Sequence, residues 1–216
     1  MTSALQKRNI RKLLVQTLTG AAVGAAGTFL FLELGGKVAN FDDPSRIFSA
    51  GVGMIYLLIG LFVGLGALMP GVGATFLNVE DAGELVEERN SIGPAAIVCL
   101  MMGIPLMLLA LTPGGDLPGA VSTEFAAAVS LVCLTGLVAA GIWLRGRYDE
   151  FNRQLGVEAS AIAMHVSLLL FGGWGALAHL GYVPWTSPLA LLAGFAAIEL
   201  AAIFWVVGRR GLLAPR

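Results

Sequence analysis

Long apolar runs joined by short polar links make up most of the chain. Each run has about the twenty residues that a helix needs to cross the hydrocarbon core of a bilayer. We expect helices over residues 13–34, 48–69, 92–111, 120–144, 157–180 and 188–207. The pattern predicts a single all-α domain over residues 1–216, a polytopic transmembrane helical bundle of six spans.

The composition agrees with this fold class. Hydrophobic residues make up 57% of the chain and charged residues 12%, with a mean hydropathy of +0.83. Soluble domains carry roughly twice that share of charge. The first run is longer than the apolar core of a signal peptide, so we expect it to remain as an uncleaved first span. Cys99 and Cys133 lie inside apolar runs, where cysteine behaves as a small hydrophobic residue, and we expect no disulfide.

The positions of the cations predict an orientation. With six spans, eleven of the thirteen Lys and Arg residues fall on the side that holds both termini. The other side holds only Lys37 and Arg46. Cytoplasmic loops carry the excess of basic residues. We therefore expect a multi-pass protein of the inner (plasma) membrane with both ends in the cytoplasm (N-in/C-in).

The fifth run holds both histidines and a stripe of polar or small residues. Glu158, His165, Gly172 and His179 are spaced seven apart, so they share one side of a regular helix. We expect this polar stripe to mark the central helix of the bundle.

Glu199 is the acidic residue deepest within the sixth run. Reflecting the chain through the turn near Pro184 places Glu199 opposite Leu168, within one helical turn of His165. Ionisable groups inside a span are costly and often functional, so we expect His165 and Glu199 to pair. The pair would serve either as a proton relay, with Glu158 and His179 extending the path, or as a contact that fixes helix register.

Glycines narrow one face of each of the first two apolar runs. Gly20 and Gly24 in the first run, and Gly60 and Gly64 in the second, repeat at four-residue intervals. Such small-xxx-small spacing lets another helix approach closely. These faces are interpreted either as packing within the bundle or as contacts with a protein partner or a second copy.

The segment 71–91 is the most polar part of the chain. If it is helical, its acidic residues lie partly on one face, and they could form a cytoplasmic docking loop, a metal site or a solvated turn. The residues of this candidate docking loop are Glu80, Asp81, Glu84, Glu87 and Glu88.

No motif indicates catalysis. The sequence has no H-E-x-x-H, no G-x-S-x-G and no phosphate-binding loop ending in Lys-Ser/Thr. Haem held between two histidines needs them on different helices, and here both lie on one. We predict no catalytic residue, metal or cofactor and, without a basic stripe, no nucleic acid partner. The leading hypothesis is a structural or accessory subunit of a membrane assembly; the alternative is a small proton-linked transporter using His165 and Glu199.

Overall fold

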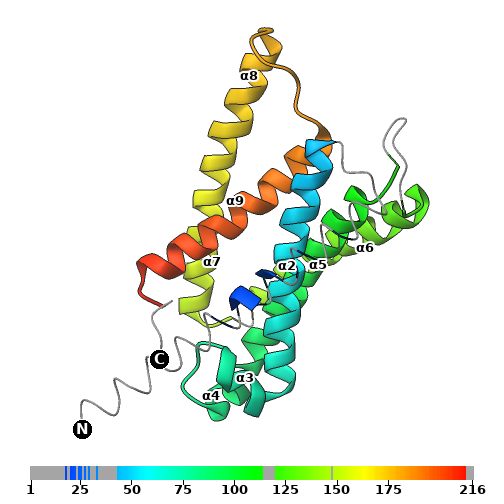
Figure 1. Cartoon of the computed structure of the whole chain (residues 1–216). Coiled ribbons are helices and arrows are strands. Elements are labelled where there is room, and N and C mark those ends of the chain that lie inside the picture. The colour runs from blue at the N-terminus through cyan, green and yellow to red at the C-terminus, as the bar shows by residue number, and fades with distance from the viewer. Residues whose placement is uncertain are drawn as a thin grey trace.

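The computed structural model describes residues 43–113, 120–146 and 148–212, together with isolated positions between 18 and 33. These parts contain helices and no strand (Figure 1). In chain order the elements are α2 Pro44–Leu68, α3 Pro70–Phe76, α4 Ala82–Glu87, α5 Arg89–Ala110, α6 Thr123–Leu144, α7 Glu150–Ser167, the π turn η1 Leu168–Gly172, α8 Gly173–His179 and α9 Pro188–Arg209.

Five helical rods in the described residues are long and apolar enough to cross a membrane. They are α2, α5, α6, the continuous α7–η1–α8 rod and α9, and they match the second to sixth predicted runs. The predicted first span, 13–34, lies outside the described residues except at isolated positions. Six spans and the N-in/C-in orientation therefore remain predictions.

Polar side chains begin most of the spans. In each case an oxygen accepts a hydrogen bond from a backbone N–H of the first turn, which would otherwise lack a partner. For α2 the acceptor is Asp43 Oδ1, 2.8 Å from the backbone nitrogen of Ser45. The same role at α6, α7 and α9 belongs to Ser122, Asp149 and Ser187.

Two glycines end the rods. Gly181 after α8 and Gly211 after α9 have φ of 80° and 74°, a left-handed conformation that glycine adopts without a Cβ clash. At the second, the N–H of Leu212 reaches back to the Val207 carbonyl at 3.1 Å. This pattern closes a helix by satisfying its last carbonyls.

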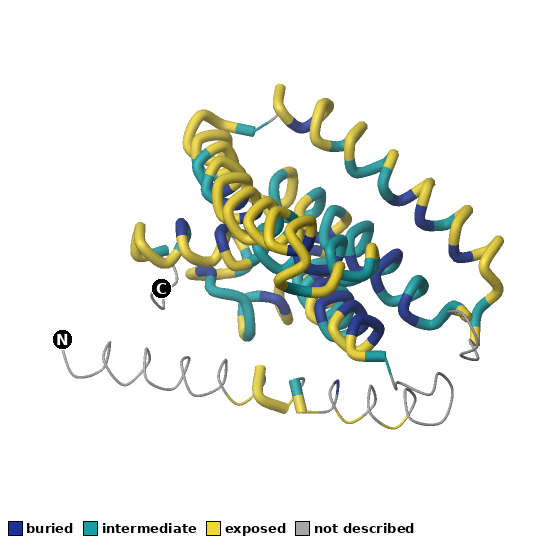
Figure 2. Tube along the Cα trace, turned by 90° about the horizontal axis from the view of Figure 1, so that it is seen from above, coloured by how far each residue is buried: buried dark blue, intermediate teal, exposed yellow. Residues whose placement is uncertain are grey.

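The centre of the described bundle is the pair α2 and α5, and the expectation that the fifth run forms the centre is wrong. α2 contacts α5, α9, α3 and α4, whereas the main packing partner of α7 is α9. Buried residues gather where α2 meets its neighbours, while most of α7 and α8 is exposed (Figure 2). The reason is side-chain size, because α2 presents glycine and serine at its contacts and lets two other helices approach.

The seam between α2 and α5 brings two backbones almost into contact. A Cβ added at Gly53 would lie 2.9 Å from the backbone nitrogen of Met107, and one added at Gly103 would lie 2.8 Å from the Gly53 carbonyl oxygen. Ser49, fully buried, donates its hydroxyl to the Leu106 carbonyl at 3.0 Å. The antiparallel helices α2 and α5 thus pack closely because glycines have no side chain at the contact, and not because large side chains interlock.

A buried arginine closes the end of this seam. Arg46 is 3% exposed. Its Nε donates to the Ala110 carbonyl and its Nη2 to the Thr112 carbonyl, both at 2.8 Å. A cation at the carbonyl end of a helix satisfies those groups and complements the helix dipole. Arg46 therefore holds the end of α5 against the start of α2.

Candidate functional site: polar groups at mid-span

Glu199 is the acidic side chain placed deepest within a described span. It lies half-way along α9 and is half-buried. Its Oε1 accepts a hydrogen bond from Ser160 Oγ of α7 at 3.0 Å. The carboxylate therefore joins α7 to α9, as the sequence suggested, but through a serine.

Tyr56 brings a second polar group to the same depth. It is 4% exposed, and its hydroxyl donates to the Ala196 carbonyl of α9 at 2.8 Å. Tyr56 is the middle residue of α2, and Cys99 lies at the middle of α5. Tyr56 is within electrostatic range of Cys99 and of Glu199, and Cys99 packs against the buried core that contains Tyr56. Tyr56, Cys99, Ser160 and Glu199 form what we call the mid-span cluster.

His165 does not join this cluster, so the expected His165–Glu199 pair is not formed among the described residues. Its Nδ1 lies 2.6 Å from the carbonyl oxygen of Ala161, on its own helix, and its side chain is exposed. The buried face of α7 holds Ala159, Ala163 and Ser167. Because each residue turns a helix by about 100°, His165 points about 200° away from Ala163 and faces outward.

The connection to α9 also shifts the two helices against each other. The link 180–187 descends from the end of α8 before α9 begins beside the start of α2 (Figure 1). A simple reflection through the turn ignores this descent. Glu199 consequently meets Ser160, earlier on the helix than the Leu168 that the reflection indicated.

The predicted polar stripe is divided by the π turn. The turn Leu168–Gly172 accommodates an extra residue, so residues after it no longer continue the seven-residue register. His179 ends α8 and is exposed. Glu158, before the turn, pairs with Arg210 and, at 3.5 Å, with Arg209 of α9. The four residues do not form one continuous polar track.

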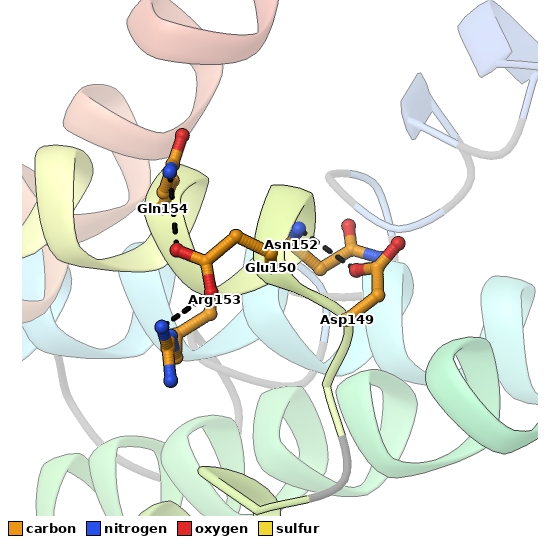
Figure 3. A network of polar contacts seen from close by, with 5 residues as sticks. All are labelled: Asp149, Glu150, Asn152, Arg153 and Gln154. Atoms are coloured by element: carbon orange, nitrogen blue, oxygen red, sulfur yellow. Dashed lines mark hydrogen bonds and ion pairs between the residues drawn. The ribbon is translucent and has the colours of Figure 1, made fainter.

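The start of α7 carries a local polar network (Figure 3). Asp149 Oδ1 accepts from the backbone N–H of Asn152 at 2.9 Å. Glu150 accepts from the Gln154 side chain at 3.1 Å and pairs with Arg153. These groups are exposed and belong to consecutive turns of one helix. The network stabilises the helix start, and Glu150, Arg153 and Gln154 also line an open cavity of about 440 Å³ together with Arg210 of the α9 end.

The predicted packing glycines have different surroundings. A Cβ at Gly60 would lie 2.8 Å from Leu100 Cγ and 3.0 Å from the Ala96 carbonyl, and one at Gly64 would lie 3.6 Å from Ala96 Cβ. Both therefore serve packing between α2 and α5. At Gly20 and Gly24, among the isolated described positions, a Cβ would meet nothing within 4 Å.

Two acidic side chains of the segment 71–91 accept hydrogen bonds from backbone N–H groups around the start of α4. Asp81 Oδ1 caps α4 by accepting from the Glu84 N–H at 3.0 Å, and Glu84 Oε2 accepts from the Glu80 N–H at 2.5 Å. Because α4 spans only Ala82–Glu87, Glu80 and Glu88 lie outside it and the predicted acidic face is not continuous. The side chains of Glu80, Asp81, Glu87 and Glu88 are exposed.

Sequence reasoning missed the serine and the tyrosine of the cluster. The available signal was Tyr56 itself, a hydroxyl in the middle of an apolar run. Across the described ranges, no group of three or more His, Cys, Asp and Glu residues could hold a metal ion. Comparisons with protein families, curated proteins and solved structures give no match to this chain.

Proposed function

We propose that this protein is a non-catalytic subunit of an assembly in the inner (plasma) membrane, crossing it six times with both termini in the cytoplasm. The observation that supports this function is the outward position of His165 near the middle of the α7–α8 rod. Ionisable side chains within a span normally face protein or water. An outward imidazole therefore favours a protein neighbour on that face.

The hydrogen bond of His165 defines what the neighbour must offer. A carbonyl oxygen only accepts, so the Nδ1 near the Ala161 carbonyl carries the proton. In the neutral imidazole Nε2 is then an acceptor directed away from the helix axis. Two copies meeting at His165 would bring together two acceptors. The partner we propose is a transmembrane helix that presents a hydroxyl, amide or indole donor at this depth.

The side chains around His165 fit a helix-packing face. Met164, Leu168 and Leu169 are 64%, 65% and 75% exposed. They would surround the polar contact with apolar area, and one polar contact within an apolar face is a common device for fixing register between membrane helices.

The test is site-directed photo-crosslinking in native membranes. A photoreactive amino acid at Leu169, one turn from His165, should give a discrete adduct with a membrane protein. The adduct should persist in His165→Gln, which keeps an acceptor, and should weaken in His165→Leu, which does not. Leu131, an equally apolar and 66% exposed position on α6, is the matched control and should give no discrete adduct. Equal adducts in the chain with His165 unaltered and in its two variants, or none in any of the three, would refute the proposal.

The orientation has its own test. Reporter enzymes that are active on only one side of the membrane can be fused after the first ten residues and at the C-terminus. Both fusions should report the cytoplasm, and opposite readings would exclude six spans.

Proton-linked transport is the second candidate, and the mid-span cluster is what favours it. Glu199 has Ser160 as its hydrogen-bond partner and no described cation within ion-pair distance. Such a carboxyl can take up and release a proton if water reaches it from either side. Proteoliposomes with an internal pH dye test this: Glu199→Gln should abolish proton flux that the unaltered chain supports, and His165→Gln should leave it unchanged. Flux that is absent from the unaltered chain would exclude this candidate.

A further inference from the structure

An open cavity of about 830 Å³ lies between the ends of three spans. Its walls come from the last turns of α2, the first half of α5 and the last turn of α6. The volume lies in the range of ligand pockets, roughly 300–1,000 Å³. The lining that matters here comprises Gly64, Leu68, Arg89, Gly93, Leu100 and Trp143. We call this the α2–α5–α6 groove.

The groove is polar at one end and apolar along its length. Arg89 and Asn90 stand at its mouth, at the start of α5, and Ile97 and Leu100 lie two to three turns deeper along the same helix. Trp143 lies in the last turn of α6. Tryptophan is enriched where a membrane meets water, so the indole places the mouth at headgroup depth and the apolar part among the acyl chains.

Arg89 is available to a ligand. Its side chain is exposed and makes no ion pair or hydrogen bond within the described part of the chain. A guanidinium matches a phosphate by paired N–H donors. Glu87, the last residue of α4, and Glu88 precede Arg89 directly and are exposed, so they would repel a ligand with a net negative charge.

We propose that the α2–α5–α6 groove binds one zwitterionic glycerophospholipid. The phosphodiester lies at Arg89, and one acyl chain follows the apolar wall past Gly93 and Leu100. The carboxylates of Glu87 and Glu88 do not line the groove, and Glu88 lines a second cavity that faces α7 and α9. Their negative charge beside Arg89 in the sequence favours a headgroup without net negative charge. This proposal is independent of the function proposed above, since the groove and His165 lie on different helices.

Quenching of Trp143 by a brominated lipid provides a direct measurement. Bromine on an acyl chain quenches an indole that it touches. The protein, with Trp174, Trp185 and Trp205 changed to Phe, is titrated in mild detergent with phosphatidylcholine brominated on its acyl chains. Saturable quenching is expected. Arg89→Gln should shift its midpoint by about tenfold, the effect of one lost charged hydrogen bond. Inorganic phosphate should not compete, because most of the groove contacts the acyl chain.

Two further variants separate the groove from general lipid contact. A Cβ at Gly93 meets nothing within 4 Å, so Gly93→Leu fills the groove without a clash at Cβ and should abolish saturation. Gly141→Leu is its control, since Gly141 has the same open surroundings on α6 but does not line the groove. Arg153→Gln is the control for charge, because Arg153 lies at the start of α7. Both controls should behave as the unaltered chain.

The outcome that overturns the proposal is quenching that rises linearly, or is absent, and is the same in all variants. That result would also follow if residues 13–34 of the chain filled the groove. Native mass spectrometry of the chain with all four tryptophans guards against misfolding of the Trp→Phe background. It should show one retained phospholipid, lost in Gly93→Leu and kept in Gly141→Leu. Retention that is the same in these two variants would also overturn the proposal.

Discussion

The glycine seam between α2 and α5 gives the sharpest stability prediction. In Gly53→Ala the new Cβ would lie 2.9 Å from the Met107 nitrogen and 3.1 Å from the Gly103 carbonyl oxygen. Both atoms are backbone, so neither can rotate away as a flexible side chain would. The two helices must separate for the methyl group to fit.

The size of the effect follows from that separation. Ordinary contacts of a Cβ begin at 3.4 Å, so α5 must retreat by the difference between 3.4 and 2.9, about 0.5 Å. A gap of that size already forfeits about a quarter of each close van der Waals contact. The retreat also lengthens the hydrogen bond from the Ser49 hydroxyl to the Leu106 carbonyl, which is 3.0 Å, toward the longest distance at which such a bond still forms. Overpacking of this kind costs about 1–3 kcal/mol, and we expect about 2 kcal/mol.

The assay is equilibrium unfolding in mixed micelles of a mild detergent and dodecyl sulfate, followed by circular dichroism. Gly51→Ala is the matched control, because it lies on the same helix and its Cβ would meet nothing within 4 Å. It should be neutral or slightly stabilising. Gly103→Ala should cost as much as Gly53→Ala, and the double variant less than the sum, since one retreat serves both methyl groups. Equal stability of Gly53→Ala and Gly51→Ala would refute the seam.

Three further predictions concern single polar groups. Tyr56→Phe removes the hydrogen bond to Ala196 and should lower the unfolding free energy by about 0.5–1 kcal/mol in the same assay. Glu158→Gln removes the ion pair with Arg210, whose side chain is 32% exposed; it should cost at most about 1 kcal/mol, and the cost should shrink at high salt. Burial raises the pKa of Tyr148, which lies outside the spans. Above the ordinary tyrosine pKa of about 10, the unfolded chain ionises this phenol while the folded chain still holds it neutral. The contribution of Tyr148 to stability is therefore full below that pKa and falls as the pH rises above it. Ultraviolet titration, compared with that of Tyr148→Phe, should show the late ionisation.

Each of these three predictions would be contradicted by a specific result. For Tyr56, a loss no larger than that of Tyr182→Phe, a 77% exposed tyrosine, would mean that the Ala196 contact adds nothing. For Glu158, a cost independent of salt would point to a role other than charge. For Tyr148, ionisation at the ordinary pH of an exposed phenol would contradict its burial.

The apolar runs predicted the five long helices of the described residues, because length and hydropathy alone decide whether a segment can cross a bilayer. The helix ends differ from the predicted ones by up to seven residues, since capping groups such as Asp43 and Asp149 set them rather than hydropathy. The depth of Glu199 was also predictable, because depth depends only on position within a run.

The side of each helix that faces the protein interior was not predictable in the same way. Lipid is as apolar as leucine, so hydropathy does not distinguish the inner side of a membrane helix from the outer side. His165 was therefore assigned to the interior on its polarity, whereas Ala159 and Ala163 pack inward because they are small. The π turn after Ser167 has no sequence signal that we used, and it changes the register of every residue that follows.

The hydrogen bond of Tyr56 has a consequence for biosynthesis. Its donor and acceptor are 140 residues apart, and α9, which supplies the acceptor, leaves the ribosome well after α2 and α5. The partly made chain must therefore hold α2 and α5 in the bilayer with a phenol hydroxyl still unsatisfied. A membrane insertase or chaperone that held the nascent chain until α9 arrived would cover that unsatisfied hydroxyl.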